Sequence, residues 1–333
     1  MRRTALLAAT AIALAAPAVA EEVNVYSTRQ PELIQPLFDA FTAQTGIDVN
    51  VVFLKSGFIE RLKAEGRRSP ADLVMTVDIG NLKAAVDEGV TQPITTPALE
   101  AAVPAAFHDP EGLWWGVTAR ARVAYVSRER VDAEALTYEE LSDPKWKGRI
   151  CTRSGAHQYN LALTAAYIAH HGEEAAQDWL EGLKANLARK PQGNDRAQVK
   201  AVWAGQCDLA IGNTYYMAKM LADPEQKEWA DSVRIVFPTF EGAGAHMNVS
   251  GVAMTTSAPN KDAAIKLMEF LVSPEGQAIY AEANAEYPVV EGVPASDMVA
   301  SWGTFSPDAL PLTEIADKRA AALRLVQTVD FDG

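Results

Sequence analysis

The chain has 333 residues, 48% of them hydrophobic, and its 30 basic and 43 acidic residues give a net charge of −13. So acidic a chain repels phosphate backbones, which argues against a nucleic-acid-binding protein. The length exceeds that of one compact core, so we expect two lobes.

Residues 1–20 have the pattern of an export signal. Arg2 and Arg3 precede an apolar stretch, and the small residues 18–20 fit a cleavage site. Without this segment the chain has 28 basic and 43 acidic residues, a net charge of −15. No later run of eighteen or more apolar residues follows. We therefore expect a soluble protein in the bacterial periplasm or an equivalent space.

Strand-like and helix-like segments alternate along the chain, which is typical of an open α/β sheet with helices on both faces. A Pro- and Ala-rich passage at about 91–109 interrupts the pattern, and a long strand that could act as a hinge follows it. Strands are expected at 22–28, 47–54, 71–77, 113–127, 146–153, 207–213, 232–238 and 248–256. Helices are expected at 31–46, 57–66, 157–172, 175–188, 197–205 and 213–223, as a pair within 260–284, and in the C-terminal tail.

These elements predict two lobes, each a mixed sheet flanked by helices, with a ligand cleft between them. We expect residues 21–119 with about 248–290 to form the N-terminal lobe. Residues 120–247 with about 291–333 would form the C-terminal lobe. A ligand would sit in the cleft while the lobes close around it, near strand carboxyl ends and helix N-termini.

Two adjacent tyrosines follow the predicted strand 207–213. Tyr215 and Tyr216 fall in the first turn of the next helix, which Asn213 or Thr214 would cap. Neighbours on a helix point about 100° apart, so one apolar face cannot bury both rings. The pair is either one core tyrosine and one surface tyrosine, or two phenolates that converge on a hard cation.

Tyr159 lies at a second strand-to-helix junction, in SGAHQYN. A free tyrosine has a pKa near 10, so holding one phenolate at pH 7 costs roughly three pH units, or about 4 kcal/mol. Three phenolates would cost about 12 kcal/mol, which only a small and highly charged ion with a preference for oxygen could supply. Tyr159, Tyr215 and Tyr216 are therefore the candidate ligands of a trivalent metal.

Three arginines could complete such a site. Arginine cannot ligate a cation, but it can hold a small anion such as carbonate by two parallel hydrogen bonds, and the anion can coordinate the metal. Arg29 and Arg120 are the predicted anion-binding residues. Arg122 would share a strand face with Arg120, but it could equally be a salt-bridged surface residue, and any of the three could be structural.

The two cysteines, Cys151 and Cys207, lie in the predicted strand segments GRICTRSG and GQCDLAIGN, which a disulfide would tie together. An even count in an oxidising compartment indicates one disulfide, and two separate buried thiols are the alternative.

Other chemistry has little support in the sequence. The five histidines form no zinc pattern, and no nucleophile elbow, phosphate loop or paired carboxylates stand out, so we expect a binding protein and not an enzyme. Trp114, Trp115 and the segment 286–289 could instead line a cleft for a small organic solute, although such residues are more often core or hinge packing.

Segments along the whole mature chain resemble those of periplasmic ferric-ion-binding proteins of bacterial ABC iron importers. These segments are VYSTRQP, SPADLVMTVDIGNL, WWGVTARARVAYVS, RSGAHQYN, the stretch 184–220 that ends in GNTYYMAKM, and NVSGVAMTT. The resemblance implies a two-lobe substrate-binding fold, Fe³⁺ in the cleft, and delivery to a membrane permease driven by a separate ATPase. It carries over Tyr159, Tyr215 and Tyr216 as metal ligands, and we expect the protein to act as a monomer.

The chain departs from some branches of that family after its first strand. Those branches have a histidine or a His-Tyr pair where this chain has Gln30 and Pro31, and neither is a good ferric ligand. This chain therefore resembles the branch that uses three tyrosines plus an exogenous anion. Tyr26, within the first strand, is expected to pack near the site without ligating.

Overall fold

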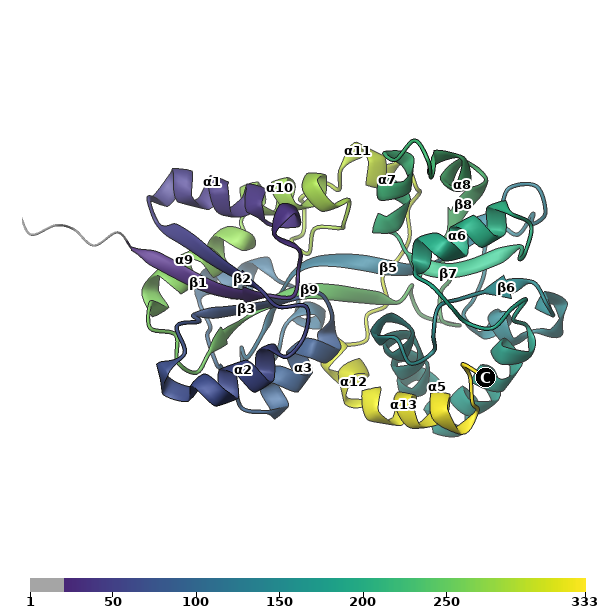
Figure 1. The fold of residues 1–333 in the computed structure, drawn as a ribbon, viewed down its shortest axis with the longest axis horizontal. Coiled ribbons are helices and arrows are strands. Elements are labelled where there is room, and N and C mark those ends of the chain that lie inside the picture. Colours follow the sequence, from purple (N-terminus) through teal and green to yellow (C-terminus); the bar gives the residue numbers. More distant parts are fainter. Residues whose placement is uncertain (1–20) are drawn as a thin grey trace, which may run out of the picture.

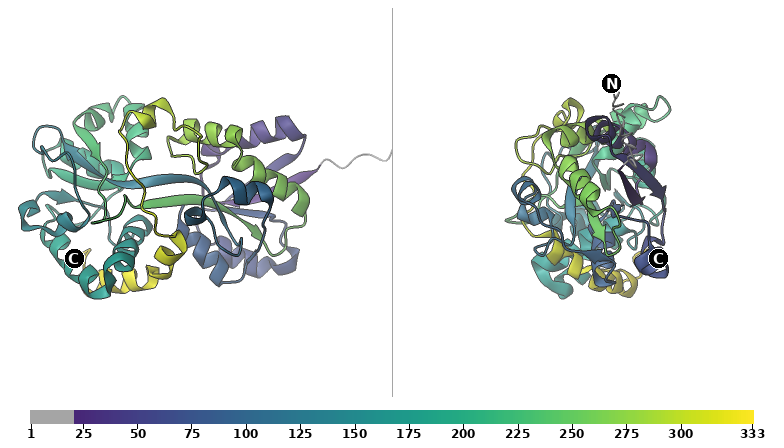
Figure 2. Two further views of the ribbon diagram at one scale, coloured as in Figure 1. Left: turned by 180° about the vertical axis from the view of Figure 1, so that it is seen from behind. Right: turned by 90° about the vertical axis from the view of Figure 1, so that its left-hand side faces the viewer.

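The computed structural model describes residues 21–333, so the predicted export signal at 1–20 lies outside the described residues. Figure 1 shows two lobes side by side, joined by two long strands that run from one lobe into the other. Each lobe has a sheet covered by helices on both faces, as the views from behind and from the end also show (Figure 2). The predicted two-lobed α/β fold is confirmed.

Nine strands of the described chain form the sheets, in the order β2-β1-β3-β9-β5-β7-β6, with β4 beside β9 and β8 beside β5. The strands are β1 (Glu22–Ser27), β2 (Asp48–Phe53), β3 (Leu73–Thr76), β4 (Thr91–Gln92), β5 (Trp115–Ser127), β6 (Ile150–Cys151), β7 (Leu209–Asn213), β8 (Val233–Val236) and β9 (Met247–Thr255).

The helices cover both faces of each sheet (Figure 1). The α-helices are α1 (Gln35–Thr45), α2 (Phe58–Glu65), α3 (Ile79–Asp87), α4 (Pro97–Ala102), α5 (Gln158–Ala185), α6 (Asp195–Trp203), α7 (Tyr215–Leu221), α8 (Lys227–Asp231), α9 (Lys261–Leu271), α10 (Pro274–Asn284), α11 (Asp297–Ala300), α12 (Leu312–Asp317) and α13 (Arg319–Thr328). Short 3₁₀ helices occur at Pro31–Leu33, Gly66–Arg68, Ala105–Phe107, Glu139–Ser142 and Pro144–Trp146.

The predicted long crossing strand is β5, which both lobes share. From Trp115 to Ala121 it pairs antiparallel with β9, and from Arg122 to Val126 it pairs antiparallel with β7. All thirteen residues of β5 are buried, because sheet neighbours and helices enclose it in both lobes. This arrangement brings Arg120 close to the point where the strand passes from one lobe to the other.

In the N-terminal lobe, β1 lies between β2 and β3, and both pairings are parallel. Because side chains alternate between the faces of a strand, Val25 packs into the main core with Phe41 of α1, while Tyr26 packs on the opposite face with Phe58 of α2. The two clusters hold helices on the two faces of the sheet.

Two elements differ in length from the prediction. The expected strand 146–153 is reduced to Ile150–Cys151, because Gly148 adopts the left-handed φ of 70° and turns the chain just before it. The two helices expected at 157–172 and 175–188 are the two parts of α5, which is broken at Gly172 (φ 85°, ψ 170°). The break lies where the sequence pattern places it.

The C-terminal segment connects the two lobes along the lower edge of the view in Figure 1. α12 contacts α3 of the N-terminal lobe and α5 of the C-terminal lobe, and α13 packs along α5 (Figure 1). Beyond α13, the Asp332 carboxylate accepts hydrogen bonds from Ser154 Oγ (2.5 Å) and Gly155 N (2.7 Å). The end of the chain therefore fixes the loop that precedes α5.

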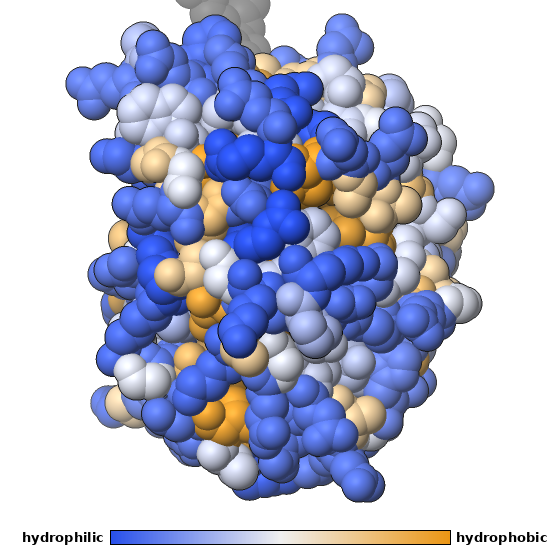
Figure 3. Space-filling view, turned by 90° about the vertical axis from the view of Figure 1, so that its right-hand side faces the viewer, coloured by the Kyte–Doolittle hydropathy of each residue, from blue (hydrophilic) through white to orange (hydrophobic). Residues whose placement is uncertain are grey.

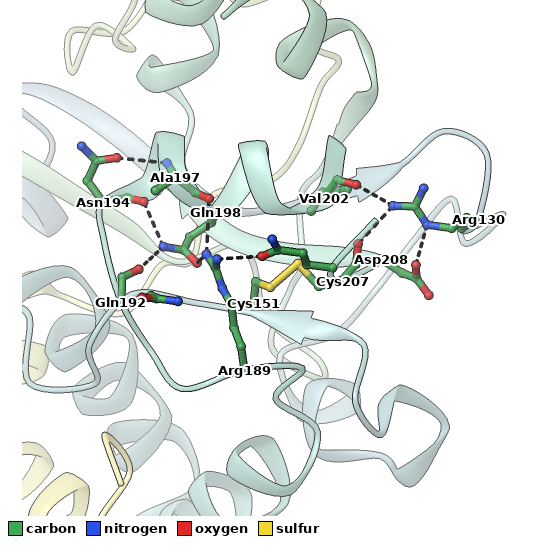
Figure 4. Close-up of a disulfide and its surroundings, with 11 residues drawn as sticks. Arg130, Cys151, Arg189, Gln192, Asn194, Ala197, Gln198, Val202, Cys207 and Asp208 are labelled. Carbon is green, nitrogen blue, oxygen red and sulfur yellow. Dashed lines mark hydrogen bonds and ion pairs between the residues drawn. A yellow bond between two sulfur atoms is a disulfide. The ribbon is translucent and has the colours of Figure 1, made fainter. Parts of the chain in front are cut away.

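Cys151 and Cys207 form the predicted disulfide, with Cα atoms 5.9 Å apart (Figure 4). The bond links β6 to the residue two positions before β7, and these strands are parallel neighbours. It therefore closes a loop of 56 residues at the sheet edge of the C-terminal lobe.

The outer end of the C-terminal lobe is mostly hydrophilic, and the hydrophobic residues on this face appear in small separate groups (Figure 3). In the part of the chain that the structure describes, no helix has the length and apolarity needed to cross a membrane.

Candidate metal site in the interlobe cleft

A cleft of about 500 Å³ lies between the lobes, and all five residues predicted to bind metal or anion line it. These residues are Arg29, Arg120, Tyr159, Tyr215 and Tyr216. They come from the loop after β1, from β5, and from the starts of α5 and α7. Residues up to 187 positions apart in the sequence thus meet in one place.

The sheet of the C-terminal lobe places the three tyrosines on one side of the cleft. β6 and β7 are parallel, so their carboxyl ends lie at the same edge, and α5 and α7 begin just beyond that edge. Tyr159 is the second residue of α5, and Tyr215 and Tyr216 are the first two residues of α7. The strand-to-helix junctions predicted for the three phenols are therefore present.

The capping predicted for α7 is wrong. Thr214 occupies the cap position with helical angles (φ −51°, ψ −48°), and no side chain caps the helix. The Asn213 side chain instead accepts a hydrogen bond from Arg122 Nη1 (3.0 Å). At α5, His157 is the cap residue, and its Nδ1 accepts from the Tyr159 backbone N–H (3.2 Å).

The phenols are close together. The hydroxyl oxygens of Tyr159 and Tyr215 lie 3.0 Å apart, within hydrogen-bond distance. The rings of Tyr215 and Tyr216 have centroids 4.3 Å apart. Tyr215 is 9% exposed, whereas the other two are half-buried and face the cleft. The tyrosine pair is therefore not divided between a core and a surface.

The surroundings of Tyr215 and Tyr216 hold these two phenols protonated when no cation is present. Burial raises the pKa of Tyr215 well above its ordinary value of 10, and the neighbouring phenols Tyr159 and Tyr216 raise it further, against the opposing charge of Arg120. Burial, followed by the Tyr159 phenol, raises the pKa of Tyr216 to about 12. A ligand that takes these groups as phenolates must displace their protons, which requires a strong positive charge.

Two buried guanidinium groups face the phenols from the other side. Arg29 Nη1 donates to Ser250 Oγ (3.2 Å) and to Glu286 Oε1 (3.2 Å), and its Nη2 lies 2.9 Å from Glu286 Oε2. Arg120 Nη1 donates to the same Ser250 hydroxyl (3.0 Å). One serine therefore holds both guanidinium groups side by side.

The two arginines keep unpaired donors. Arg29 Nε and both Nε and Nη2 of Arg120 are buried without a hydrogen-bond partner among the described residues. Burial alone would lower the pKa of Arg29, but the Glu286 carboxylate and the nearby phenols outweigh it and leave that pKa raised. Permanently charged donors without partners at a cleft wall are suited to holding a small anion.

Arg122 does not belong to this wall. It is 2% exposed and forms a buried ion pair with Asp195, with Nη1 and Oδ2 2.7 Å apart. Arg122 is therefore salt-bridged, as the sequence allowed, but it is buried and not at the surface. It also does not line the cleft.

Sequence reasoning did not identify Ser250 or Asn194 as residues of the cleft region, and it placed Glu286 in a cleft only within the segment 286–289, considered for an organic solute and not as a partner of Arg29. Glu286 and Asn194 line the cleft, and Ser250 joins its two arginines. Glu286 pairs with a partner 257 positions away in the sequence, so no local pattern marks it.

The tryptophans considered for an organic solute, and Tyr26, lie outside the cleft. Trp114 and Trp115 are each 1% exposed and belong to the main core, so they do not form a binding surface for an organic solute. The Tyr26 hydroxyl donates to the Glu65 carboxylate (2.9 Å to each oxygen), outside the cleft. Within residues 21–333, no group of three His, Cys, Asp or Glu side chains could hold a metal ion. In this part of the chain, a metal would depend on other oxygen donors.

The fold and the cleft define a two-lobed α/β ligand-binding protein. The sequence profile of bacterial extracellular solute-binding proteins matches residues 68–306. The chain belongs to that family.

Several relatives cover nearly the whole chain. Iron uptake protein A1 of Synechocystis sp. is 45% identical over 314 residues, which are 93% of this chain and 87% of that protein. The crystal structure of ferric iron-binding protein A of Mannheimia haemolytica in an open conformation matches with a TM-score of 0.91 and 49% identity, over 94% of this chain and all of that one. A Trichodesmium protein in complex with iron and citrate matches with a TM-score of 0.90 and 42% identity, over 93% and 99% of the two chains.

Proposed function

We propose that the protein binds one Fe³⁺ ion in the interlobe cleft and delivers it to a membrane importer. The ligands are the phenolate oxygens of Tyr159, Tyr215 and Tyr216, and a small anion such as carbonate, held by Arg29 and Arg120, completes the coordination shell. The observation that carries the proposal is the 3.0 Å separation of the Tyr159 and Tyr215 hydroxyls at a shared sheet edge, with Tyr216 beside them.

The donor set favours a trivalent ion. At pH 7, a pKa of about 12 for Tyr216 corresponds to a deprotonation cost of about 7 kcal/mol, at 1.36 kcal/mol per unit. A hard, highly charged cation repays this cost through short bonds to phenolate oxygen, whereas soft or weakly charged ions do not. The iron named in the relatives' descriptions supports the same choice.

The anion has separate support. Three phenolates occupy half of an octahedral shell, and the unpaired guanidinium donors of Arg29 and Arg120 offer charge-assisted hydrogen bonds to an oxyanion. The citrate in the Trichodesmium complex agrees with an anionic co-ligand but leaves its identity here open to carbonate or a carboxylate.

Family membership supports transport and not turnover. Solute-binding proteins of this kind serve ABC importers, so the partners we infer are a membrane permease and its ATPase. The protein acts as a monomer in the periplasm and carries out no reaction on its cargo.

Titration of the metal-free protein with a ferric chelate tests the proposal. Phenolate-to-iron charge transfer gives a red or purple product that saturates at one iron per chain, and Tyr215→Phe bleaches the band and weakens binding sharply. Tyr167→Phe is a suitable control, because Tyr167 is a buried tyrosine of α5 that packs on Trp179 away from the cleft. A sample that stays colourless at saturation refutes the proposal.

A further inference from the structure

We propose that the buried Arg122–Asp195 ion pair is a positioning unit that fixes the two tyrosine-bearing helix starts relative to each other and so sets the geometry of the metal site. This inference rests on the proposed ferric function. Neither residue lines the cleft, so each acts through its neighbours.

Arg122 joins both junctions through one guanidinium group. Its Nη2 donates to Asn160 Oδ1 (2.6 Å), and Asn160 directly follows Tyr159. Its Nη1 donates to Asn213 Oδ1 (3.0 Å), and Asn213 ends the strand that leads into Tyr215. Because the guanidinium is planar and rigid, these two bonds set the distance between the two asparagines.

Asp195 completes the unit through the same guanidinium nitrogen that binds Asn213. Its Oδ2 accepts from Arg122 Nη1 (2.7 Å) and from the Asn213 backbone N–H (2.9 Å). Its Oδ1 accepts from Arg153 Nη1 (3.0 Å), just upstream of α5. The carboxylate is fully buried, so solvent cannot replace any of these partners.

Asn160 extends the unit into the loop before α5. Its Nδ2 lies within 3.1 Å of three acceptors, which are Thr152 Oγ1 and the carbonyl oxygens of Arg153 and Ser154. Loop 152–154, the start of α5 and the end of β7 are thereby tied to a single charged pair.

The charged atoms also lie close to a ligand ring. The guanidinium carbons of Arg122 and Arg153 lie 5.8 Å and 5.2 Å from the centroid of the Tyr159 ring. A buried ion pair on its own is weak grounds for stability, because desolvation offsets its attraction. Its contacts to both junctions, however, give this pair a role in placing phenol oxygens, where groups behind metal ligands typically change affinity by about 10–100-fold.

The same lobe holds a matched control. Asp208 also bridges two arginines, with Oδ1 2.6 Å from Arg130 Nε and Oδ2 2.7 Å from Arg149 Nε, but it lies near the disulfide and outside the cleft (Figure 4). Asp195→Asn and Asp208→Asn therefore each remove a carboxylate that bridges two arginines, although the Asp208 triad is partly exposed (Asp208 19%) and the Asp195 triad is more deeply buried. Only the first triad contacts the tyrosine junctions.

The test compares the two variants with wild type by ferric affinity, by the energy of the charge-transfer band and by the melting temperature without iron. We expect Asp195→Asn to lose about 10–100-fold in affinity and to shift the band, and Asp208→Asn to keep both within about twofold and without a band shift. Wild-type affinity and band in Asp195→Asn, whatever its melting temperature, would overturn the inference.

A second variant and the wild-type band keep the test decisive. If Asp195→Asn does not fold, Arg122→Lys replaces it, since lysine keeps the buried charge but cannot span both asparagines; it should shift the band, and an unchanged band overturns the inference. If wild type gives no charge-transfer band, the proposed function fails and this inference fails with it. A coloured wild type with an unaltered Asp195→Asn variant refutes the positioning role alone.

Discussion

Removing one phenol should change the pH dependence of iron binding by a whole proton. The pKa values of Tyr215 and Tyr216 lie well above neutral pH, the second at about 12, so both phenols carry their protons in the metal-free protein. Each must release its proton when it binds iron as a phenolate. Binding therefore strengthens as pH rises and weakens as pH falls.

The magnitude follows from proton counting. Two released protons correspond to about 2.7 kcal/mol per pH unit, or about 100-fold in affinity, and any further proton adds about tenfold. Tyr216→Phe removes one of the two, so the slope of log affinity against pH should fall by one. Its affinity at any one pH should also fall, because a ligand is lost.

Competition against a chelator of known pH-dependent ferric affinity, between about pH 6 and 8, measures these slopes. Comparing variant and wild type under the same anion concentration cancels protons released by the chelator and the anion. Tyr167→Phe is the matched control, because burial raises the pKa of Tyr167 to about 12 as well, yet the residue lies outside the cleft. Equal slopes in Tyr216→Phe and wild type would refute the assignment of Tyr216 as a phenolate ligand.

Three further predictions concern stability. Glu286→Gln leaves the buried Arg29 charge without its carboxylate and should lower the free energy of unfolding by about 3–5 kcal/mol. Because the Arg29 charge then lacks a partner, added phosphate should raise the melting temperature of this variant more than that of wild type. Equal increases would argue against an anion at Arg29. Cys207→Ser opens a 56-residue loop and should cost up to about 4 kcal/mol by chain entropy, measured by urea unfolding, whereas no loss would show that the bond is not formed in solution. Burial, reinforced by Arg122, lowers the pKa of His246 to about 3, so the folded state excludes a proton that the unfolded state binds below about pH 6.5. The free energy of unfolding should therefore fall by about 3 kcal/mol from pH 7 to pH 4, and the fall should be correspondingly smaller in His246→Leu. Equal falls in His246→Leu and wild type would show that His246 is exposed in solution.

The sequence was sufficient for features that depend on local pattern. The strand-like segment 113–127 predicted the long strand β5 between the lobes, because its β-branched and aromatic residues favour a strand. The tandem of Tyr215 and Tyr216 predicted a site, because helix geometry prevents one apolar face from burying two successive rings. The position of Tyr159 at a similar junction predicted that it would lie with them.

Features that depend on contacts between distant residues were not predictable in this way. Arg122 reaches partners 38, 73 and 91 positions away, so its buried role could not be distinguished from a surface salt bridge. Glu286 lies 257 positions after Arg29 in the sequence, so no local pattern pairs its carboxylate with that arginine. The shortening of β6 depended on a turn at Gly148, which the strand-like composition around it concealed.

The most direct test of the account is the position of the metal itself. Crystals of the iron-loaded protein, measured at the iron absorption edge, should show one anomalous peak in the interlobe cleft. We predict that this peak lies within coordination distance of the phenolic oxygens of Tyr159, Tyr215 and Tyr216, with an anion between it and Arg29 and Arg120. A peak bound to other residues, or to only one of the three phenols, would contradict the account.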